Sequence, residues 1–242
     1  MSAILSCQSV SKKYTKRFGG VKELLIKRPS RKFNRYFREW ALQDVSFEVP
    51  SGVAFGVVGH NGSGKSTLLS LLLGTVYPDK GDINVRGRVA SLLELGAGFH
   101  PELTGRDNVK LFCTLMGMTF RESKQKFDSI ADFSEIGLSL DDPLRTYSSG
   151  MIARLGFSVV AHMSADIILI DEVLGVGDSK FKEKCHHFLR NFVRMGGTQV
   201  IVSHEMSSIR SMCEEGLWLH EGRVQARGDI DNVLSKYAES GS

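Results

Sequence analysis

Three short, largely apolar runs stand out along the chain. They cover residues 53–58, 167–170 and 199–203, and glycine or polar residues follow each of them directly. Runs of this length are typical of strands that are buried on both faces of a parallel sheet. Because such sheets bind ligands at the carboxyl ends of their strands, we expect the residues after the three runs to lie at one edge of the sheet.

The remaining pattern predicts an antiparallel sheet near the N-terminus and a group of helices in the middle of the chain. Thr104 and Asp107, three residues apart, indicate a capping box at the start of a helix that continues through Met116. The other predicted elements are antiparallel strands over 3–14 and 41–50, helices over 67–73, 152–161 and 230–238, and a hairpin over 217–226. We therefore predict one α/β domain over residues 1–242, in which a helical subdomain, about 104–162, interrupts a core of residues 1–103 and 163–242.

Composition places the chain among ordinary globular proteins. A length of 242 residues with 42% hydrophobic residues is enough for one large α/β core. No apolar run approaches the roughly 18 to 20 residues of a membrane-spanning helix, and the first residues do not resemble a signal peptide, so we expect a cytoplasmic protein. The four cysteines lack the spacing of a zinc site or a disulfide framework and are expected to be reduced, partly buried thiols: Cys7, Cys113, Cys185 and Cys213.

Positive charge is concentrated in one segment. Residues 12–40 contain eleven Lys and Arg against two Glu, a balance of +9, so the rest of the chain carries 4 − 9 = −5. A basic insertion, about 15–39, could meet nucleic acid, anionic lipid headgroups or a phosphorylated substrate, or could be a solvated surface insertion.

Residues 59–66 carry the clearest chemistry. Two spaced glycines followed by Lys65 and Ser66, between a predicted strand and a predicted helix, match the loop that wraps backbone N–H groups around phosphates. Lys65 is expected to reach the β- and γ-phosphates, and the Ser66 hydroxyl to bind Mg²⁺. The predicted nucleotide-contacting set is Gly59, His60, Asn61, Gly62, Ser63, Gly64, Lys65, Ser66 and Thr67. GTPases, kinases and recombinases share such a loop, so the loop alone does not define the reaction.

Two further strands deliver polar side chains to the same sheet edge. The run at 167–170 ends in Asp171 and Glu172, of which the first is expected to hold Mg²⁺ and the second to activate water as a general base. The run at 199–203 is followed by His204, which could hydrogen-bond the γ-phosphate.

A second possible phosphate site precedes the helix predicted at 152–161. Ser148, Ser149 and Gly150 would offer N–H groups at that helix start. Since the chain already has one phosphate loop, this helix start could serve the nucleotide of another copy. An ordinary helix cap at Ser148 or Ser149 explains the same residues.

Together these motifs resemble the ATP-binding subunits of ABC transporters, from residue 3 to residue 235. The resemblance implies a P-loop NTPase core with an inserted helical subdomain, in which residues 59–66 form Walker A and residues 147–151 the signature motif. It makes Asp171 and Glu172 Walker B with the catalytic glutamate, Asp178 the D-loop aspartate and His204 the switch histidine. Such domains hydrolyse ATP after closing head to tail as a pair around two ATP molecules.

Departures from the usual family pattern indicate the polysaccharide-export branch. The signature reads Tyr-Ser-Ser-Gly-Met, and residues 92–105 replace the usual glutamine-bearing loop. Both features, with the basic insertion, are most similar to Wzt-type ATPases that export lipid-linked O-antigen; capsule and teichoic-acid exporters are close relatives. Glu94 is the nearest polar candidate for the missing metal-side glutamine, although a gapless match falls on Leu95. The family also implies an aromatic ring stacked on adenine, for which Tyr14 is favoured and Trp40 is the alternative.

The resemblance implies ATP and Mg²⁺ as cofactors and three partners: a second copy of the chain, a separate polytopic transmembrane permease and a lipid-linked polysaccharide. It places the protein at the cytoplasmic face of the bacterial inner membrane as a peripheral subunit, with no nucleic-acid partner. A soluble ABC ATPase of DNA repair or translation is the main alternative, but the Lys65–Asp171 interval has no coiled coil and only one Walker A is present. A nucleotide-gated regulatory protein is a third possibility, against which Glu172 argues.

Overall fold

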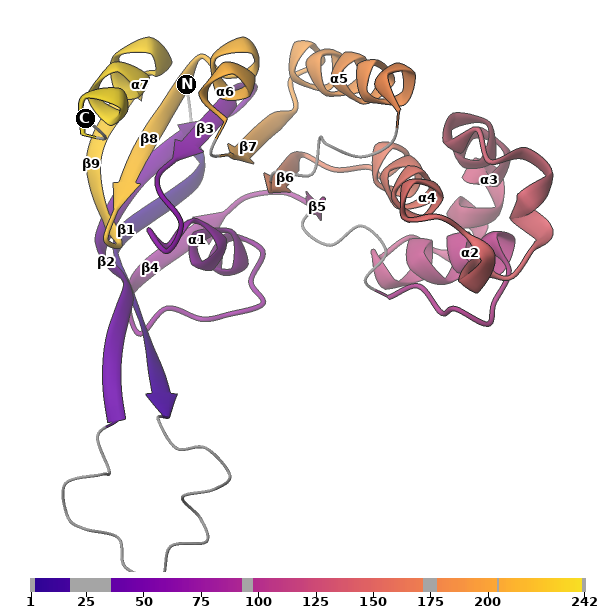
Figure 1. Cartoon of the computed structure of the whole chain (residues 1–242), viewed down its shortest axis with the longest axis horizontal. Helices are drawn as coiled ribbons and strands as arrows, with labels where there is room; N and C mark the ends of the chain where they lie inside the picture. The colour runs from indigo at the N-terminus through magenta and orange to yellow at the C-terminus, as the bar shows by residue number, and fades with distance from the viewer. Residues whose placement is uncertain (1–2, 18–35, 93–97, 172–177, 204, 241–242) are drawn as a thin grey trace, which may run out of the picture.

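The computed structural model describes residues 3–17, 36–92, 98–171, 178–203 and 205–240 (Figure 1). Glu94, Glu172 and His204, each predicted to have a functional role, lie outside these ranges. Among the described helices, none has the length and apolar character needed to cross a membrane.

A six-stranded sheet forms the centre of the molecule. Its order is β5-β6-β7-β3-β8-β9, with parallel pairing from β5 to β8 and an antiparallel β9 at the edge. The strands are β3 Ala54–Val58, β5 Val89–Ser91, β6 Ile167–Asp171, β7 Thr198–Val202, β8 Glu215–His220 and β9 Arg223–Asp229. The three apolar runs are thus neighbouring central strands, and the prediction of a parallel α/β core is confirmed.

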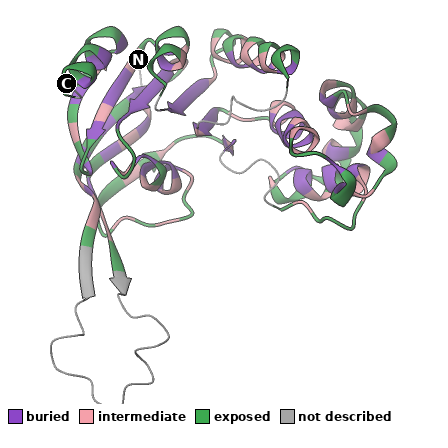
Figure 2. Cartoon of the chain, viewed as in Figure 1, coloured by how far each residue is buried: buried purple, intermediate pink, exposed green. Residues whose placement is uncertain are grey.

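The central strands are apolar throughout because both of their faces are covered. In β3, Phe55 and Val57 pack with helix α1, Lys65–Leu72, and with the small sheet, whereas Ala54 and Val58 pack into the core on the opposite face. Alternate side chains of a strand point to opposite faces, so a strand between two cores has no polar position along its length. Figure 2 shows β3, β6 and β7 as almost continuously buried.

The smaller sheet is antiparallel and has the order β2-β1-β4. Its strands are β1 Ala3–Arg17, β2 Tyr36–Pro50 and β4 Lys80–Val85, and the β1–β2 hairpin projects from the body as an arm (Figure 1). Pairing continues to Arg17 opposite Tyr36, so both strands are longer than predicted and run into the segment taken as a basic insertion. The charged residues Lys16, Arg17, Arg38 and Glu39 interrupt the apolar pattern in this extension, so the sequence did not predict it as strand. Next to it, Lys13 lies over the ring of its cross-strand partner Trp40, with 3.7 Å between Nζ and the ring centroid.

Three helices between β5 and β6 pack on one another at one end of the molecule (Figure 1). These are α2 Gly105–Leu115, α3 Phe120–Ser134 and α4 Ser149–Ala161, with short 3₁₀ helices at Gly137–Asp141 and Leu144–Thr146. Thr104 caps α2 as predicted, but Asp107 accepts from the Thr104 hydroxyl instead of closing a reciprocal box. The complete capping box stands at Thr119 and Glu122, at the start of α3.

The last helices cover the remaining face of the large sheet. They are α5 Ser179–Arg194, α6 Met206–Met212 and α7 Ile230–Glu239, which contribute buried residues to the same core as α2–α4. The late hairpin and the final helix are therefore present where the sequence predicted them. All four cysteines are buried and free, more deeply enclosed than the partly buried thiols that were expected.

Candidate functional site

The turn between β3 and α1 brings backbone N–H groups together at the start of a helix. Gly64 is the residue before α1, has φ 105° and contributes no side-chain cap, so the positive end of the helix faces the loop without a capping side chain. A Cβ atom at Gly64 would stand 2.5 Å from the carbonyl oxygen of Ala41. Glycine is therefore required here both for its backbone angle and for the close approach of strand β2.

Lys65 lies across this loop and is almost completely buried. Its ammonium donates to the carbonyl oxygens of Gly59 at 2.6 Å and His60 at 3.0 Å. The positive charge is thus held at the mouth of the loop, where the β- and γ-phosphates of a nucleotide would lie.

A cavity of about 290 Å³ opens beside Lys65. Its walls include the carboxylate-bearing end of β6, Asp171, together with Ser66 at the start of α1. The complete lining is Ala41, Asn61, Gly62, Gly64, Lys65, Ser66, Thr67 and Asp171. Most residues of the predicted nucleotide-contacting set therefore surround one cavity, which we call the phosphate pocket.

The donor set of the phosphate pocket suits Mg²⁺ in a nucleotide complex. Among the described residues, no cluster of three or more His, Cys, Asp or Glu side chains is placed to hold a metal ion alone. Mg²⁺ is commonly held by one or two protein oxygens, with phosphates and waters as the other ligands. The hydroxyl of Ser66 and the carboxylate of Asp171 on one cavity wall provide such a pair.

The adenine candidates lie on the paired strands β1 and β2. Tyr14 has 41% of its surface exposed, and Trp40 directly precedes Ala41 of the phosphate pocket. Lys12 lies over the Tyr14 ring at 5.8 Å, as Lys13 does over Trp40 at the shorter distance given above. Neither ring is part of the pocket wall.

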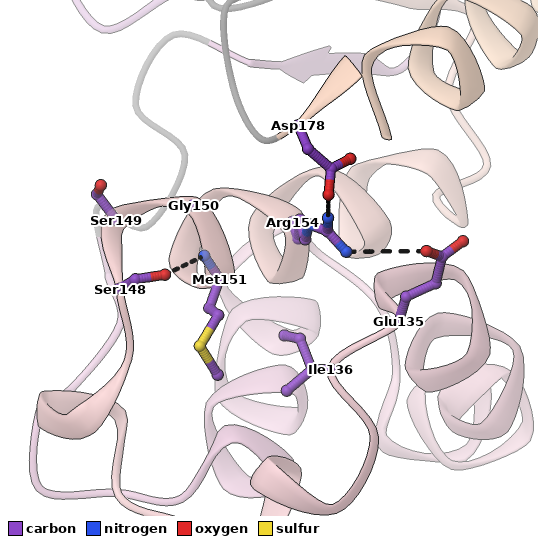
Figure 3. Close-up of a pocket in the computed structure, with 8 residues that line it drawn as sticks. All are labelled: Glu135, Ile136, Ser148, Ser149, Gly150, Met151, Arg154 and Asp178. Atoms are coloured by element: carbon purple, nitrogen blue, oxygen red, sulfur yellow. Dashed lines mark hydrogen bonds and ion pairs between the residues drawn. The ribbon is translucent and has the colours of Figure 1, made fainter. Parts of the chain in front are cut away.

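The predicted signature residues form a separate cavity of about 550 Å³ at the start of α4 (Figure 3). The Ser148 hydroxyl accepts a hydrogen bond from the N–H of Met151 at 3.2 Å, so Ser148, and not Ser149, is the cap of this helix. The lining residues are Glu135, Ile136, Ser148, Ser149, Gly150, Met151, Arg154 and Asp178. We call this cavity the signature pocket.

Asp178 joins the signature pocket from the start of α5. One carboxylate oxygen accepts from the N–H of Phe181 at 2.9 Å, and the other accepts from the Arg154 guanidinium. The backbone N–H of Phe181 and, next, the charge of Arg154 hold the pKa of the Asp178 carboxyl below its usual range, so it is ionised at neutral pH.

Two groups of residues at these sites carried no recognisable sequence signal. Arg154, Glu135 and Lys184 form an ion-pair network in and beside the signature pocket, with residues from three separate helical segments. The ring of His60 packs against Tyr237 of α7, with 5.1 Å between the ring centroids, so the second residue of the phosphate loop contacts the last helix. Only the fold brings these residues together.

The two pockets share no residue and lie in different parts of the chain. Figure 1 shows α1, at the phosphate pocket, well separated from α4, at the signature pocket. A nucleotide bound at the phosphate loop of one chain is therefore not in contact with the signature residues of that same chain.

Comparison with known proteins gives a consistent result. A family model described as "ABC transporter" matches residues 42–175. The chain is 44% identical to the O-antigen export system ATP-binding protein RfbB of Klebsiella pneumoniae over 91% of its own length and 90% of that protein. It is 40% identical to the teichoic acids export ATP-binding protein TagH of Bacillus anthracis over 94% of its length, which spans only 40% of the longer TagH.

Solved structures show the same fold at lower identity. The ATP-binding cassette MJ0796, in a dimeric post-hydrolysis state bound to ADP and Pi, matches with a TM-score of 0.72 and 20% identity, over 93% of this chain and 98% of that one. The likeness supports the arrangement of sheets and helices described above.

Proposed function

Since this chain belongs to the ATP-binding subunits of the ABC transporter family, and is therefore an ATPase, we propose that it powers the export of a lipid-linked polysaccharide. O-antigen is the substrate that we favour, because the Klebsiella relative named for O-antigen export is similar over nearly the whole of both chains. Teichoic acid is the alternative, supported by the similarity to TagH.

One observation carries the mechanism: the phosphate pocket and the signature pocket are separate on the chain. We propose that two copies pair head to tail, so that the signature pocket of each copy faces the phosphate pocket of the other. The start of α4, with Ser148, Ser149 and Gly150, would then supply N–H groups and a positive helix end to the partner's γ-phosphate. The dimeric state of the MJ0796 cassette is consistent with this arrangement.

Within each composite site, the described residues have distinct proposed tasks. Lys65 stabilises the charge that develops on the phosphates, and Ser66 with Asp171 would hold Mg²⁺, which neutralises phosphate charge when bound. Glu172 is proposed as the general base and His204 as the residue that contacts the γ-phosphate. For the adenine ring we propose stacking on Tyr14, with Trp40 as the alternative.

Export requires a membrane-embedded partner, and we propose a separate polytopic permease. This chain would then work at the cytoplasmic face of the bacterial inner membrane as a peripheral subunit. The surface that includes Phe99 is our candidate for the contact, because Phe99 is partly buried against Phe112 of α2 and leaves the rest of its surface free. The basic residues of the β1–β2 arm are candidates for attraction to lipid or pyrophosphate charge, which would weaken as salt rises.

The composite site is tested with the variant Glu172→Gln. Without its general base the chain should retain ATP and accumulate as a dimer, measurable by size-exclusion chromatography with light scattering, while hydrolysis falls below detection. The same variant without ATP is the control and should elute as a monomer. Monomers that hydrolyse ATP normally would refute the proposed mechanism.

The substrate is tested by complementation. In a bacterium that lacks its own O-antigen export ATPase but keeps the permease, the wild-type chain should restore O-antigen at the cell surface, and Glu172→Gln should not. Restoration of teichoic acid in a corresponding Gram-positive strain, without restoration of O-antigen, would establish the alternative. Failure in both, with normal ATP-dependent dimers, would point to an ABC ATPase outside these export systems.

A further inference from the structure

Arg154 lines the signature pocket from within helix α4, and its side chain is only 18% exposed. Figure 3 shows its guanidinium between two carboxylates, those of Asp178 and Glu135. It donates to Asp178 at the start of α5, and its other terminal nitrogen stands 3.8 Å from Glu135 at the end of α3. A single planar guanidinium thus connects three helical segments.

Glu135 is held in an unusual backbone conformation that aims it at this arginine. It directly follows α3 and has φ 55°, in the left-handed region that a side chain other than glycine rarely adopts. Its Oε1 accepts from Lys184 of α5 at 2.9 Å, whereas its Oε2 is the oxygen that faces Arg154. A strained backbone conformation persists when surrounding contacts fix it, and here the contacts of the Glu135 carboxylate with Arg154 and Lys184 do so.

The three helices also pack on one another through aromatic rings. Below the ion pairs, Phe133 of α3, Phe157 of α4 and Phe181 of α5 lie with their ring centroids 6.0 to 6.1 Å apart. Such contacts between large rings help to hold the helices together. The Arg154 guanidinium lies over the Phe181 ring, with 4.9 Å to the ring centroid, so Arg154 packs on this aromatic group and also fixes the direction of two carboxylates at the pocket wall.

Asp178 is the carboxylate whose direction matters most. Its side chain is 61% exposed, and within the described part of the chain its other hydrogen bond is the one that it accepts from the N–H of Phe181. Arg154 is six residues beyond Ser148 in α4, so the arginine that holds Asp178 is rigidly attached to the helix whose start forms the other part of the pocket.

We propose that Arg154 is a positioning residue that locks Asp178 to helix α4, so that the signature helix start and the D-loop aspartate approach the partner's nucleotide as one preformed surface. This inference rests on the proposed head-to-tail dimer. A preformed surface binds more tightly because the ordering of its side chains has already been achieved before association.

The test measures ATP-dependent dimerisation in the Glu172→Gln background. Arg154→Ala should weaken the dimer by up to about tenfold, the cost of ordering one side chain on association, while the affinity of the monomer for nucleotide stays unchanged. Arg154→Lys keeps the positive charge but cannot contact both carboxylates in the same way. Its dimer affinity should lie between those of the Glu172→Gln background and of Arg154→Ala. The matched control is Arg145→Ala, because Arg145 pairs with Glu102 at 3.1 Å on the exposed surface of the same helical group and should leave the dimer unaffected.

A double-mutant cycle with Asp178→Asn separates positioning from independent effects. If Arg154 acts through Asp178, the double variant should dimerise no more weakly than the weaker of the two single variants. The inference would be overturned if the losses of dimer affinity in the two single variants multiplied in the double variant. It would also be overturned if Arg154→Ala left the dimer unchanged or lowered the monomer's affinity for nucleotide. Failure of Glu172→Gln itself to dimerise with ATP would instead refute the proposed function, and the inference with it.

Discussion

The close approach of strand β2 to the phosphate loop can be tested with alanine substitutions at two glycines. Both substitutions strain the backbone, but only one of them places a Cβ against β2. Gly64 and Gly74 both have positive φ, 105° and 78°, so alanine at either position is strained by about 1–2 kcal/mol. At Gly74 nothing lies within 4 Å of the new Cβ, whereas at Gly64 the Cβ would meet the Ala41 oxygen at 2.5 Å. That distance is about 1 Å short of ordinary van der Waals contact, so the loop or the strand must move.

In urea titrations, we expect both Gly64→Ala and Gly74→Ala to lower the free energy of unfolding. The Gly64→Ala protein should be somewhat the less stable of the two. Their activities should differ far more, because a misplacement of about 1 Å at a reacting centre can cost about a hundredfold in rate. Steady-state ATP hydrolysis should therefore be close to wild type in Gly74→Ala and reduced by about two orders of magnitude in Gly64→Ala. Equal hydrolysis by the two variants would refute the steric argument.

Three further results are expected. Ser148→Ala removes the cap of α4, which costs about 1 kcal/mol and should lower the melting temperature by about 2–4 °C. Ser149→Ala removes no cap and should leave the melting temperature unchanged, so equal shifts in the two variants would contradict the capping assignment. The hydrogen bond from Lys184 lowers the pKa of Glu135 below 4.5, so the stabilising effect of the pair is present above that pH and lost in acid. Lys184→Met should lower the urea midpoint more at pH 7 than at pH 2, where the contacts of Lys184 with Phe133 remain, and an equal difference at the two pH values would count against the pair. Burial raises the pKa of Cys7, Cys185 and Cys213 to about 12, so a thiol reagent at pH 8 should label these cysteines only in denaturant.

The strands were predictable because their apolar runs are uninterrupted and short. The same reasoning set the predicted helix at 67–73 two residues late, since the phosphate loop passes directly into α1 at Lys65 with Gly64 as its cap. The strands over 3–14 and 41–50 were predicted, but their extensions at 15–17 and 36–40 were not, because charged residues interrupt the apolar pattern there. The hydrophobic pattern thus predicted the strands that are buried in the core, and it missed the parts of β1 and β2 that pair outside the core.

The phosphate pocket was likewise predictable, because most of its residues follow one another along the chain. Asp171 could be added from the end of a strand, since parallel strands share one edge. The network of Glu135, Arg154 and Lys184 could not be found in this way, because its members come from three helical segments with no common spacing. Sequence reasoning also left the cap of α4 open between Ser148 and Ser149, which the hydrogen bond to Met151 decides.

The position of β3 has a consequence for the order in which the protein matures. Both neighbours of this strand, β7 and β8, belong to the last fifth of the sequence, and the turn after β8 contacts the phosphate loop through a bond from the Gly222 N–H to the Ser63 oxygen at 3.0 Å. During synthesis, the loop at residues 59–66 emerges from the ribosome long before these supports exist. We therefore expect a nascent chain to gain a shaped phosphate loop only near the end of translation.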